Sequence, residues 1–251
     1  MRKMLIAGNW KMNKTIPESL QLIHALMRKL DFDCPAEVVL IPPFISLSSA
    51  AEALSGSGVQ LGAQNLSHLA EGAVTGEISA SMLISVGCRY VLVGHSERRN
   101  LFQEDDTVIN QKLKTALSEG LHAILCVGET WKEREAGKTN DIIGNQLKRG
   151  LEGLSLMEMR KVTIAYEPVW AIGTGKHALP GQAQEVHEAI RSELSSQYDP
   201  ETANATRIIY GGSVTPDSSP SLLTQPDVDG VLVGGASLDA DSFYAIINAV
   251  K

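Results

Sequence analysis

The chain has 251 residues, 43% of them hydrophobic, and its 22 basic and 29 acidic residues leave a formal net charge of −7. This charge disfavours a broad surface for nucleic acid or anionic membranes, and the apolar share is that of a protein with a substantial core. Three cysteines beside apolar segments favour buried thiols over a disulfide framework or a metal site, and no apolar run approaches the length of a membrane span, so we expect a cytoplasmic protein.

Short apolar runs recur along the whole chain. They are apolar throughout rather than alternating, which predicts parallel strands covered on both faces. The predicted strands are residues 4–8, 38–41, 59–63, 90–94, 123–127, 162–167, 207–211 and 230–233.

Helix-like stretches separate most of these strands. The first follows Lys14, where Thr15 and Glu18 have the spacing of a capping box and Pro17 stands in the opening turn. Apolar residues then recur at helical intervals. The other predicted helices are residues 108–117, 142–151, 183–194 and a last one from 239, with shorter ones at 50–54, 79–86 and 218–223.

About eight strand–helix repeats without a linker predict a (β/α)₈ barrel, a single domain over residues 1–251. An open doubly wound sheet is the alternative. Polar residues and glycines that follow the strands favour the barrel, because a closed ring brings the ends of distant strands to one small molecule. These rim residues are Asn9, Lys11, Gln64, Asn65, His95, Glu97, Glu129, Glu167, Ser213, Gly234 and Gly235.

Glu167 ends an apolar run and is followed by a loop that opens with Pro168 and closes with glycine. A carboxylate fixed by a strand can abstract a proton reproducibly, and a loop with pliable ends can close over a substrate. A surface turn with one ionised Glu is the alternative interpretation. The candidate lid consists of Pro168, Val169, Trp170, Ala171, Ile172, Gly173, Thr174, Gly175, Lys176, His177 and Ala178.

His95 stands just beyond a strand, where the following turn can present free N–H groups, and is a candidate acid or electrophile. A lone His is usually structural, and the other five histidines have no such setting. Lys11 directly follows the first strand and is a solvated charge, a phosphate partner or a Schiff-base nucleophile. Nearby polar residues, Glu97 among them, favour a cation that stabilises an anion.

Glycine pairs follow the last two predicted strands, at residues 211–212 and 234–235. Without side chains, their backbone N–H groups can approach an anion, and this is the usual phosphate corner of such a barrel. Ordinary turns also use glycine pairs.

Taken together, residues 9–13, 94–99, 166–175, 210–214 and 232–237 closely resemble the triosephosphate isomerase family. Residues 64–65, 75–77 and 126–129 fall in the same order as in that family, so the match spans nearly the whole chain. The resemblance implies a (β/α)₈ barrel that interconverts dihydroxyacetone phosphate and D-glyceraldehyde 3-phosphate through an enediolate, in glycolysis and gluconeogenesis. It implies neither a cofactor nor a metal.

The resemblance also implies roles for individual residues. Glu167 is the base, His95 and Asn9 hydrogen-bond the enediolate oxygens, and Lys11 supplies positive charge. The same implied mechanism has a neutral imidazole tuned by a helix N-terminus. By the same resemblance, Glu97 orients Lys11, Ser96 holds Glu167 before the lid closes, Tyr210 and Ser213 latch the lid, and backbone N–H groups of Gly173, Ser213, Gly234 and Gly235 bind the phosphate.

Residues 64–77 resemble the loop by which each subunit of the family's dimer reaches the other's active site. The resemblance therefore implies a homodimer with Gln64, Asn65 and Thr75 at the contact. Val74 replaces the family's usual aromatic residue there, which bears on interface tightness. His177 and Leu179 depart from the usual residues at the second hinge of the lid, which bears on closure rather than on the chemistry.

Two other functions stay open. A barrel aldolase would use Lys11 as a Schiff-base nucleophile with the same phosphate corner. A phosphosugar-binding protein would bind an enediolate mimic without turnover.

Overall fold

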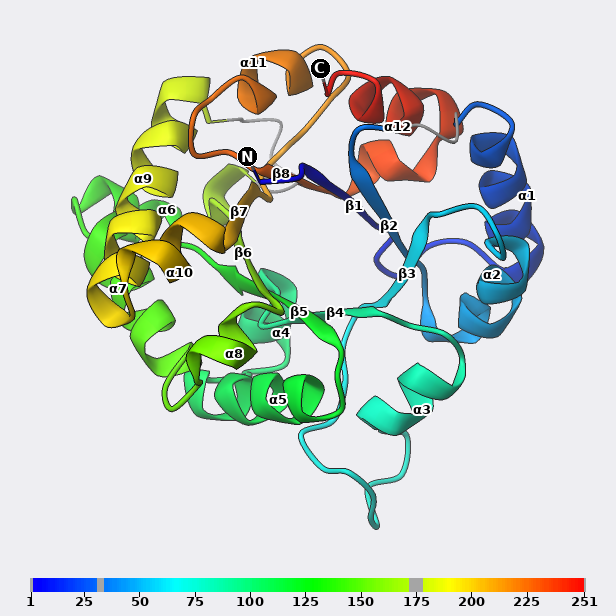
Figure 1. Cartoon of the computed structure of the whole chain (residues 1–251), viewed down its shortest axis with the longest axis horizontal. Helices are drawn as coiled ribbons and strands as arrows, with labels where there is room; N and C mark the ends of the chain where they lie inside the picture. The colour runs from blue at the N-terminus through cyan, green and yellow to red at the C-terminus, as the bar shows by residue number, and fades with distance from the viewer. Residues whose placement is uncertain (1, 31–33, 172–177, 251) are drawn as a thin grey trace.

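The computed structural model describes residues 2–30, 34–171 and 178–250. Within these ranges, eight parallel strands pair in chain order and close into a barrel (Figure 1). This confirms the predicted (β/α)₈ barrel, and the open sheet is wrong. The strands are β1 (Leu5–Asn9), β2 (Glu37–Ile41), β3 (Gln60–Ala63), β4 (Tyr90–Val93), β5 (His122–Val127), β6 (Val162–Tyr166), β7 (Arg207–Tyr210) and β8 (Gly230–Val233).

Helices surround the barrel as an outer layer (Figure 1). They are α1 (Ile16–Met27), α2 (Leu47–Ala53), α3 (Ala80–Ser85), α4 (Ser96–Leu101), α5 (Asp106–Ser118), α6 (Trp131–Glu135), α7 (Thr139–Gly150), α8 (Leu156–Met159), α9 (Pro180–Gln197), α10 (Pro200–Ala205), α11 (Ser219–Leu223) and α12 (Ala240–Ile247), with 3₁₀ turns η1 (Phe44–Ser46), η2 (Val169–Ala171) and η3 (Gly235–Leu238). None of the helices in the described parts of the chain has the length and apolar character that crossing a bilayer requires.

The strands are apolar throughout because both of their faces are covered. Alternate residues, such as Leu5, Tyr90 and Ile124, belong to a small cluster inside the barrel. The residues between them, such as Ile6 and Val91, join the larger cluster that packs against the helices. Burial of this apolar surface, at roughly 25 cal/mol per Å², is the main term that stabilises the barrel.

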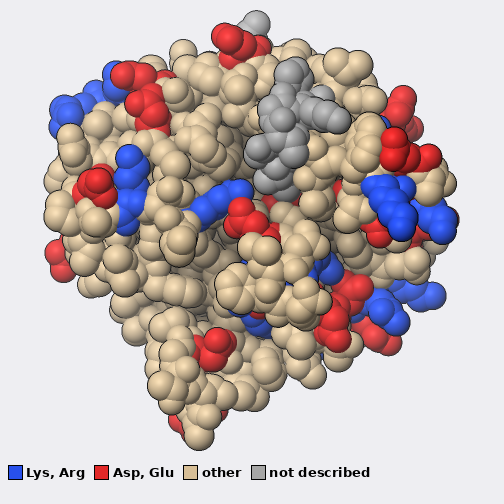
Figure 2. Space-filling view, turned by 180° about the vertical axis from the view of Figure 1, so that it is seen from behind, with Lys and Arg blue, Asp and Glu red and all other residues tan. Residues whose placement is uncertain are grey.

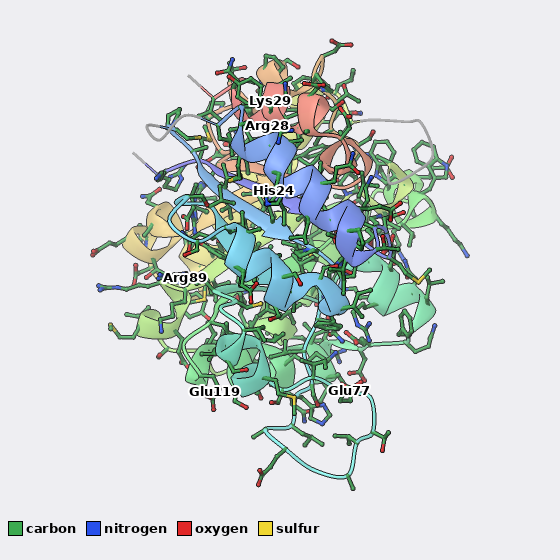
Figure 3. All side chains as sticks on the ribbon, turned by 90° about the vertical axis from the view of Figure 1, so that its right-hand side faces the viewer. His24, Arg28, Lys29, Glu77, Arg89 and Glu119 are labelled. Atoms are coloured by element: carbon green, nitrogen blue, oxygen red, sulfur yellow. The ribbon has the colours of Figure 1, made fainter. Side chains whose placement is uncertain are left out.

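The first helix shows how local sequence sets an element's start. The Glu18 carboxylate accepts a 2.7 Å hydrogen bond from the Thr15 N–H, as the predicted capping box requires. His24 on α1, and Arg28 and Lys29 just after its end, are exposed (Figure 3), while the apolar residues of α1 pack on the barrel.

The strand ends differ slightly from prediction. β6 ends at Tyr166, one residue before Glu167, although the Glu167 N–H still donates to the Val127 carbonyl at 2.7 Å. The sequence analysis did not predict α4, α6, α8 or α10, which have six residues or fewer. The predicted α3 and α11 are as short but carry apolar residues, whereas α4, α6 and α10 have too few large apolar residues to mark a buried face, and α8 has only four residues.

Candidate active site

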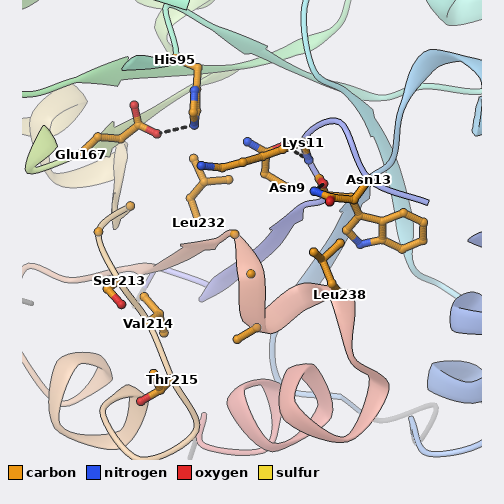
Figure 4. A pocket seen from close by; sticks show the side chains of 16 residues that line it. Asn9, Lys11, Asn13, His95, Glu167, Ser213, Val214, Thr215, Leu232 and Leu238 are labelled. Carbon is orange, nitrogen blue, oxygen red and sulfur yellow. Dashed lines mark hydrogen bonds and ion pairs between the residues drawn. The ribbon is translucent and has the colours of Figure 1, made fainter. Parts of the chain in front are cut away.

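The carboxyl ends of the strands surround a hollow of about 420 Å³. Figure 2 shows a face where basic and acidic side chains meet near the centre, beside a hollow. Residues from five strand ends line the cavity (Figure 4). The cavity brings together these residues of the predicted site: Asn9, Lys11, His95, Glu167, Ser213, Gly234 and Gly235.

His95 follows β4 and is the N-cap of α4. Its Nδ1 accepts a hydrogen bond from the Glu97 N–H at 3.2 Å, one of the free N–H groups of the first helical turn. Its Nε2 lies 3.0 Å from Glu167 Oε1. Because an accepting Nδ1 carries no proton, the ring hydrogen is on Nε2, which donates to the carboxylate. This arrangement suits a neutral imidazole.

Glu167 follows β6 and is only 2% exposed. Its Oε2 accepts a 2.9 Å hydrogen bond from the backbone N–H of Ser96, so Ser96 contacts the carboxylate through its main chain. Burial raises the pKa of Glu167, but the His95 imidazole, the Ser96 N–H and the Lys11 charge more than offset this, and the pKa is lowered overall. The carboxylate is therefore ionised, as a base must be.

The contact between Glu167 and His95 lowers the pKa of Glu167 but raises the pKa of His95. Burial alone lowers the pKa of His95, but the ionised Glu167 reverses this and raises it. The raised pKa depends on Glu167 staying beside the ring. Without the carboxylate beside the ring, burial would favour the neutral imidazole.

Lys11 has a left-handed backbone with φ of 52°. A side chain other than glycine pays about 1 kcal/mol for this conformation. Two hydrogen bonds hold it, since the Lys11 N–H donates to Asn9 Oδ1 at 3.0 Å and Gln64 Nε2 donates to the Lys11 carbonyl at 2.8 Å. The Nζ atom donates to Glu97 Oε1 at 2.6 Å, so the carboxylate that was predicted to orient Lys11 does contact it.

The predicted phosphate corner lies on the opposite side of the hollow from His95, where Figure 4 shows Ser213. Gly234 and Gly235 follow β8, and a Cβ added at Gly235 would meet nothing within 4 Å. The backbone there is thus open toward the cavity. Gly173, the fourth predicted phosphate ligand, lies outside the described residues.

The structure describes only the two ends of the candidate lid. Pro168 precedes η2, and within η2 Trp170 Nε1 donates to Glu129 Oε1 at 3.0 Å. At the far end, the Ala178 N–H donates to the Tyr210 hydroxyl at 3.4 Å, so Tyr210 contacts one end of the candidate lid. The predicted lid residues Ile172, Gly173, Thr174, Gly175, Lys176 and His177 lie outside the described part of the chain.

Glu129 is a residue whose role the sequence analysis missed. It was placed on the rim without a function, yet it is fully buried and its Oε1 accepts hydrogen bonds from Tyr166, Trp170 and Arg134 at 3.0 to 3.1 Å. Arg134, five residues after Glu129, was the only one of these three partners that lies nearby in the sequence. Glu129 thus links Trp170, at the first end of the candidate lid, to Tyr166 at the end of β6.

His187, on α9, is also close to the site although the sequence analysis gave it no role. It is fully buried beneath Tyr166 and Tyr210. Burial lowers its pKa to about 4. The ring is therefore neutral at neutral pH.

This lowered pKa gives a testable pH dependence. As pH falls from about 6.5 toward 4, the unfolded chain binds a proton at this histidine while the folded protein does not, so the free energy of unfolding falls. At about 1.4 kcal/mol per pKa unit, the shift of His187 should lower the free energy of unfolding by roughly 3 kcal/mol between pH 7 and pH 4. Urea unfolding of wild type and His187→Phe at pH 7 and pH 4 measures this. Acidic groups lower the stability of both proteins alike, so the difference between the two pH dependences reports His187. Equal pH dependence in the two would contradict the prediction.

The sequence of this chain is similar to those of known proteins over nearly its whole length. Residues 4–250 match the family described as "Triosephosphate isomerase". The chain belongs to the triosephosphate isomerase family. It is 52% identical over 248 residues to "Triosephosphate isomerase" of Moorella thermoacetica, covering 99% of both chains. It is 49% identical to the protein of that name from Prosthecochloris aestuarii, over 100% of this chain and 99% of the other, and 49% identical to that of Caldanaerobacter subterraneus subsp. tengcongensis, over 99% and 100%.

Leu179 is one of the departures from the triosephosphate isomerase pattern noted above. It is the N-cap of α9 with extended backbone, is 63% exposed, and has no side-chain oxygen to accept an N–H of the first turn. Only the other half of the cap is present, since Gln182 Oε1 accepts the Leu179 N–H at 3.0 Å.

Replacing Leu179 by Ser should therefore raise the free energy of unfolding by about 1 kcal/mol, because Ser supplies the missing acceptor. Chemical denaturation measures the change. The matched control is Asp239→Ala, which removes the acceptor that binds the Ser242 N–H at the start of α12 and should lower stability by about the same amount. An unchanged stability in Leu179→Ser would contradict this assignment of the cap.

Proposed function

We propose that this protein interconverts dihydroxyacetone phosphate and D-glyceraldehyde 3-phosphate through an enediolate, without a cofactor. One observation carries the proposal. Glu167, His95 and Lys11, from three different strand ends, line a single hollow that also reaches the glycine corner of Gly234 and Gly235. A base, a hydrogen-bond donor, a cation and a site for phosphate thus surround a volume of triose size.

The chemistry begins with Glu167. Its carboxylate leaves the Ser96 N–H and removes a proton from the carbon next to the substrate carbonyl. The electrons move onto the carbonyl oxygen, where His95 Nε2–H and Asn9 donate hydrogen bonds and Lys11 offsets the negative charge. Glu167 then returns the proton to the neighbouring carbon, and the hydroxyl proton passes from the first oxygen to the former carbonyl oxygen, where the His95 ring can relay it. These two proton transfers complete the isomerisation without any net gain or loss of electrons.

The lid has a protective role in this proposal. An enediolate next to a phosphate ester can expel the phosphate, and closure excludes the water and freedom of movement that favour this loss. Residues 168–178 would close, with backbone N–H groups of Gly173, Ser213, Gly234 and Gly235 on the phosphate. Tyr210 and Ser213 would latch the closed lid.

A coupled assay with dihydroxyacetone phosphate tests the activity. The proposal requires turnover, whereas a phosphosugar-binding protein would bind an enediolate mimic and form no product. Borohydride added with carbonyl substrate tests the aldolase alternative, which requires covalent trapping at Lys11. The Lys11–Glu97 ion pair favours the isomerase, because an ammonium held by a carboxylate is in its non-nucleophilic form.

We further propose that the protein is a homodimer. Residues 68–77, at the far part of the loop between β3 and α3, are all exposed, and the loop projects from the barrel (Figures 1 and 3). Its base is held within the chain, since Gln64 binds the Lys11 carbonyl and Asn65 Oδ1 accepts from Lys112 Nζ at 2.7 Å. The loop, with Thr75 near its tip, would reach toward the partner's active site.

Sedimentation should then give about twice the chain mass of 27.0 kDa. Val74→Glu, which places a charge on the loop, should weaken the dimer and lower specific activity on dilution, because a buried charge without a partner opposes association. The control is Leu156→Glu, an exposed apolar residue on α8 that should leave the mass unchanged. A monomeric but fully active wild type would contradict the dimer proposal.

The remaining assignments are also proposals. Residues 1–251 would act as one catalytic domain, and the protein would work in the cytoplasm. The second assignment is supported by its cysteines, since Cys34, Cys88 and Cys126 are all free thiols, as a reducing compartment would keep them.

A further inference from the structure

His187 links three parts of the molecule that meet behind the active site. Its ring packs against the edge of Tyr166, with centroids 5.9 Å apart, and lies 6.4 Å from the ring of Tyr210. The two tyrosine rings are themselves 6.3 Å apart. The three rings come from α9, β6 and β7, and α9 begins just beyond the lid. His187 therefore packs between the strand ends that carry the base and the latch.

Both tyrosine hydroxyls form hydrogen bonds near the two ends of the candidate lid. The Tyr166 hydroxyl donates to Glu129 at 3.1 Å, and the Tyr210 hydroxyl accepts the Ala178 N–H at 3.4 Å. The Tyr210 hydroxyl has little space, since a Cβ added at Gly212 would lie 2.2 Å from it and 3.0 Å from Pro168. Because the hydrogen bond from the Ala178 N–H is already 3.4 Å long, a small rotation of the Tyr210 ring would break it.

The hydrogen bonding of His187 fixes its own ring. Nδ1 is 3.1 Å from the Asp227 carbonyl, which can only accept, so Nδ1 carries the hydrogen. Asp227 is itself clamped by Arg191 and Gln184, at 2.5 and 2.7 Å. The imidazole is thus anchored to a rigid loop, and its orientation is set independently of the tyrosines.

Packing alone does not account for a histidine at this position. His187 Nε2 is buried and has no hydrogen-bond partner among the residues that the structure describes. A buried acceptor without a partner is destabilising, and a phenylalanine would fill the same space without one. What the imidazole adds over phenylalanine is the bond from Nδ1 to Asp227, which prevents the ring from turning.

We propose that His187 is a positioning residue for the isomerisation: it holds the Tyr210 ring so that the hydroxyl meets the Ala178 N–H at the end of the lid. The inference rests on the proposed isomerase function. His187 lines no part of the hollow and acts only through Tyr210.

A double-mutant cycle of His187→Phe and Tyr210→Phe tests this coupling. Each single variant should lower kcat about 10-fold, because a latch displaced by a fraction of an ångström leaves the lid less often closed. KM should change less than about 2-fold, and more inorganic phosphate should be released per turnover as the enediolate escapes protection. The double variant should be no worse than Tyr210→Phe alone, since both changes remove one function.

The matched control is His122→Phe. His122 is a partly buried histidine that packs on Tyr90 at 5.1 Å, but it begins β5 at the opposite end of the barrel from the site. Its replacement should leave kcat and phosphate release unchanged, whatever it does to the melting temperature. If His187→Phe does not fold, the cycle is run with His187→Asn, which keeps an N–H for Asp227 but lacks the ring that holds Tyr210. The same non-additivity is expected.

Two results would overturn the inference while leaving the isomerase function intact. One is a double variant whose loss of kcat is the product of the two single losses. The other is a His187 variant with unchanged kcat and unchanged phosphate release in a protein that melts earlier, which would mark the residue as structural only. Absence of isomerase activity in the wild type would instead overturn the proposed function itself, and this inference with it.

Discussion

Glu167→Asp should lower kcat about 100-fold while KM stays within about 3-fold of wild type. The substitution keeps the charge but withdraws the carboxylate by one methylene, and a misplacement of roughly 1 Å can cost ~10²-fold in rate. Binding should change little because Glu167 contacts Ser96 and His95 in the ligand-free site and touches the substrate mainly during proton transfer. Steady-state kinetics in both directions measure the effect.

The control for this prediction is Glu158→Asp. Glu158 is partly exposed and caps α8 through Ser155, so its shortening should change stability slightly and kcat not at all. Near-normal turnover in Glu167→Asp would contradict its role as the base. A large rise in KM at normal kcat would instead assign Glu167 to substrate binding.

Lys11→Met should lower kcat/KM by roughly 10³-fold. Removal of one preorganised group that stabilises a developing oxyanion typically costs ~10²–10³ in kcat, and Lys11 also attracts the anionic substrate. We therefore expect KM to rise as well as kcat to fall. Methionine lacks only the terminal atom of the lysine side chain, so the loss reports the charge rather than the packing.

Lys14→Met is the matched control for Lys11→Met. Lys14 stands three residues later and shares a left-handed backbone, with φ of 75°, but it does not line the hollow. Its replacement removes the same charge from the same end of the barrel. If kcat/KM falls as much in Lys14→Met as in Lys11→Met, the effect is general electrostatic attraction of the anionic substrate. A fall of less than about 10-fold in Lys11→Met would contradict a direct role for Lys11.

Much of the fold was readable from the sequence because each strand is a short apolar run that ends in polar residues. The run at 230–233 coincides with β8, and the capping residues at 15–18 set the start of α1. The closed barrel followed from eight repeats and a shared rim. Where prediction failed, α4 has a single large apolar residue and α8 has only four residues, so neither shows a hydrophobic period.

The site was predictable in part. Strand ends indicated Lys11, His95 and Glu167, since the carboxyl ends of barrel strands face one another. The pairing of Lys11 with Glu97, which are 86 residues apart, came from the family resemblance, because spacing in the sequence gives no geometry across the barrel. The structure shows them in contact.

Other parts of the site depend on tertiary packing that no local pattern carries. Gln64 was expected at a subunit contact, yet within the chain it supports the strained backbone of Lys11. His187 looked like any helical histidine, and only the packing of α9 on β6 and β7 brings it against Tyr166 and Tyr210. Such contacts depend on how an element is rotated about its axis, which the sequence pattern sets only coarsely.

The most direct test of the central claim is isomerisation of dihydroxyacetone phosphate in deuterium oxide, followed by nuclear magnetic resonance. Proton transfer through Glu167 and an enediolate predicts aldehyde product with deuterium on the carbon next to the carbonyl, and loss of both product and label in Glu167→Gln. Product that forms rapidly in wild type without any deuterium, or undiminished labelling in Glu167→Gln, would contradict the account.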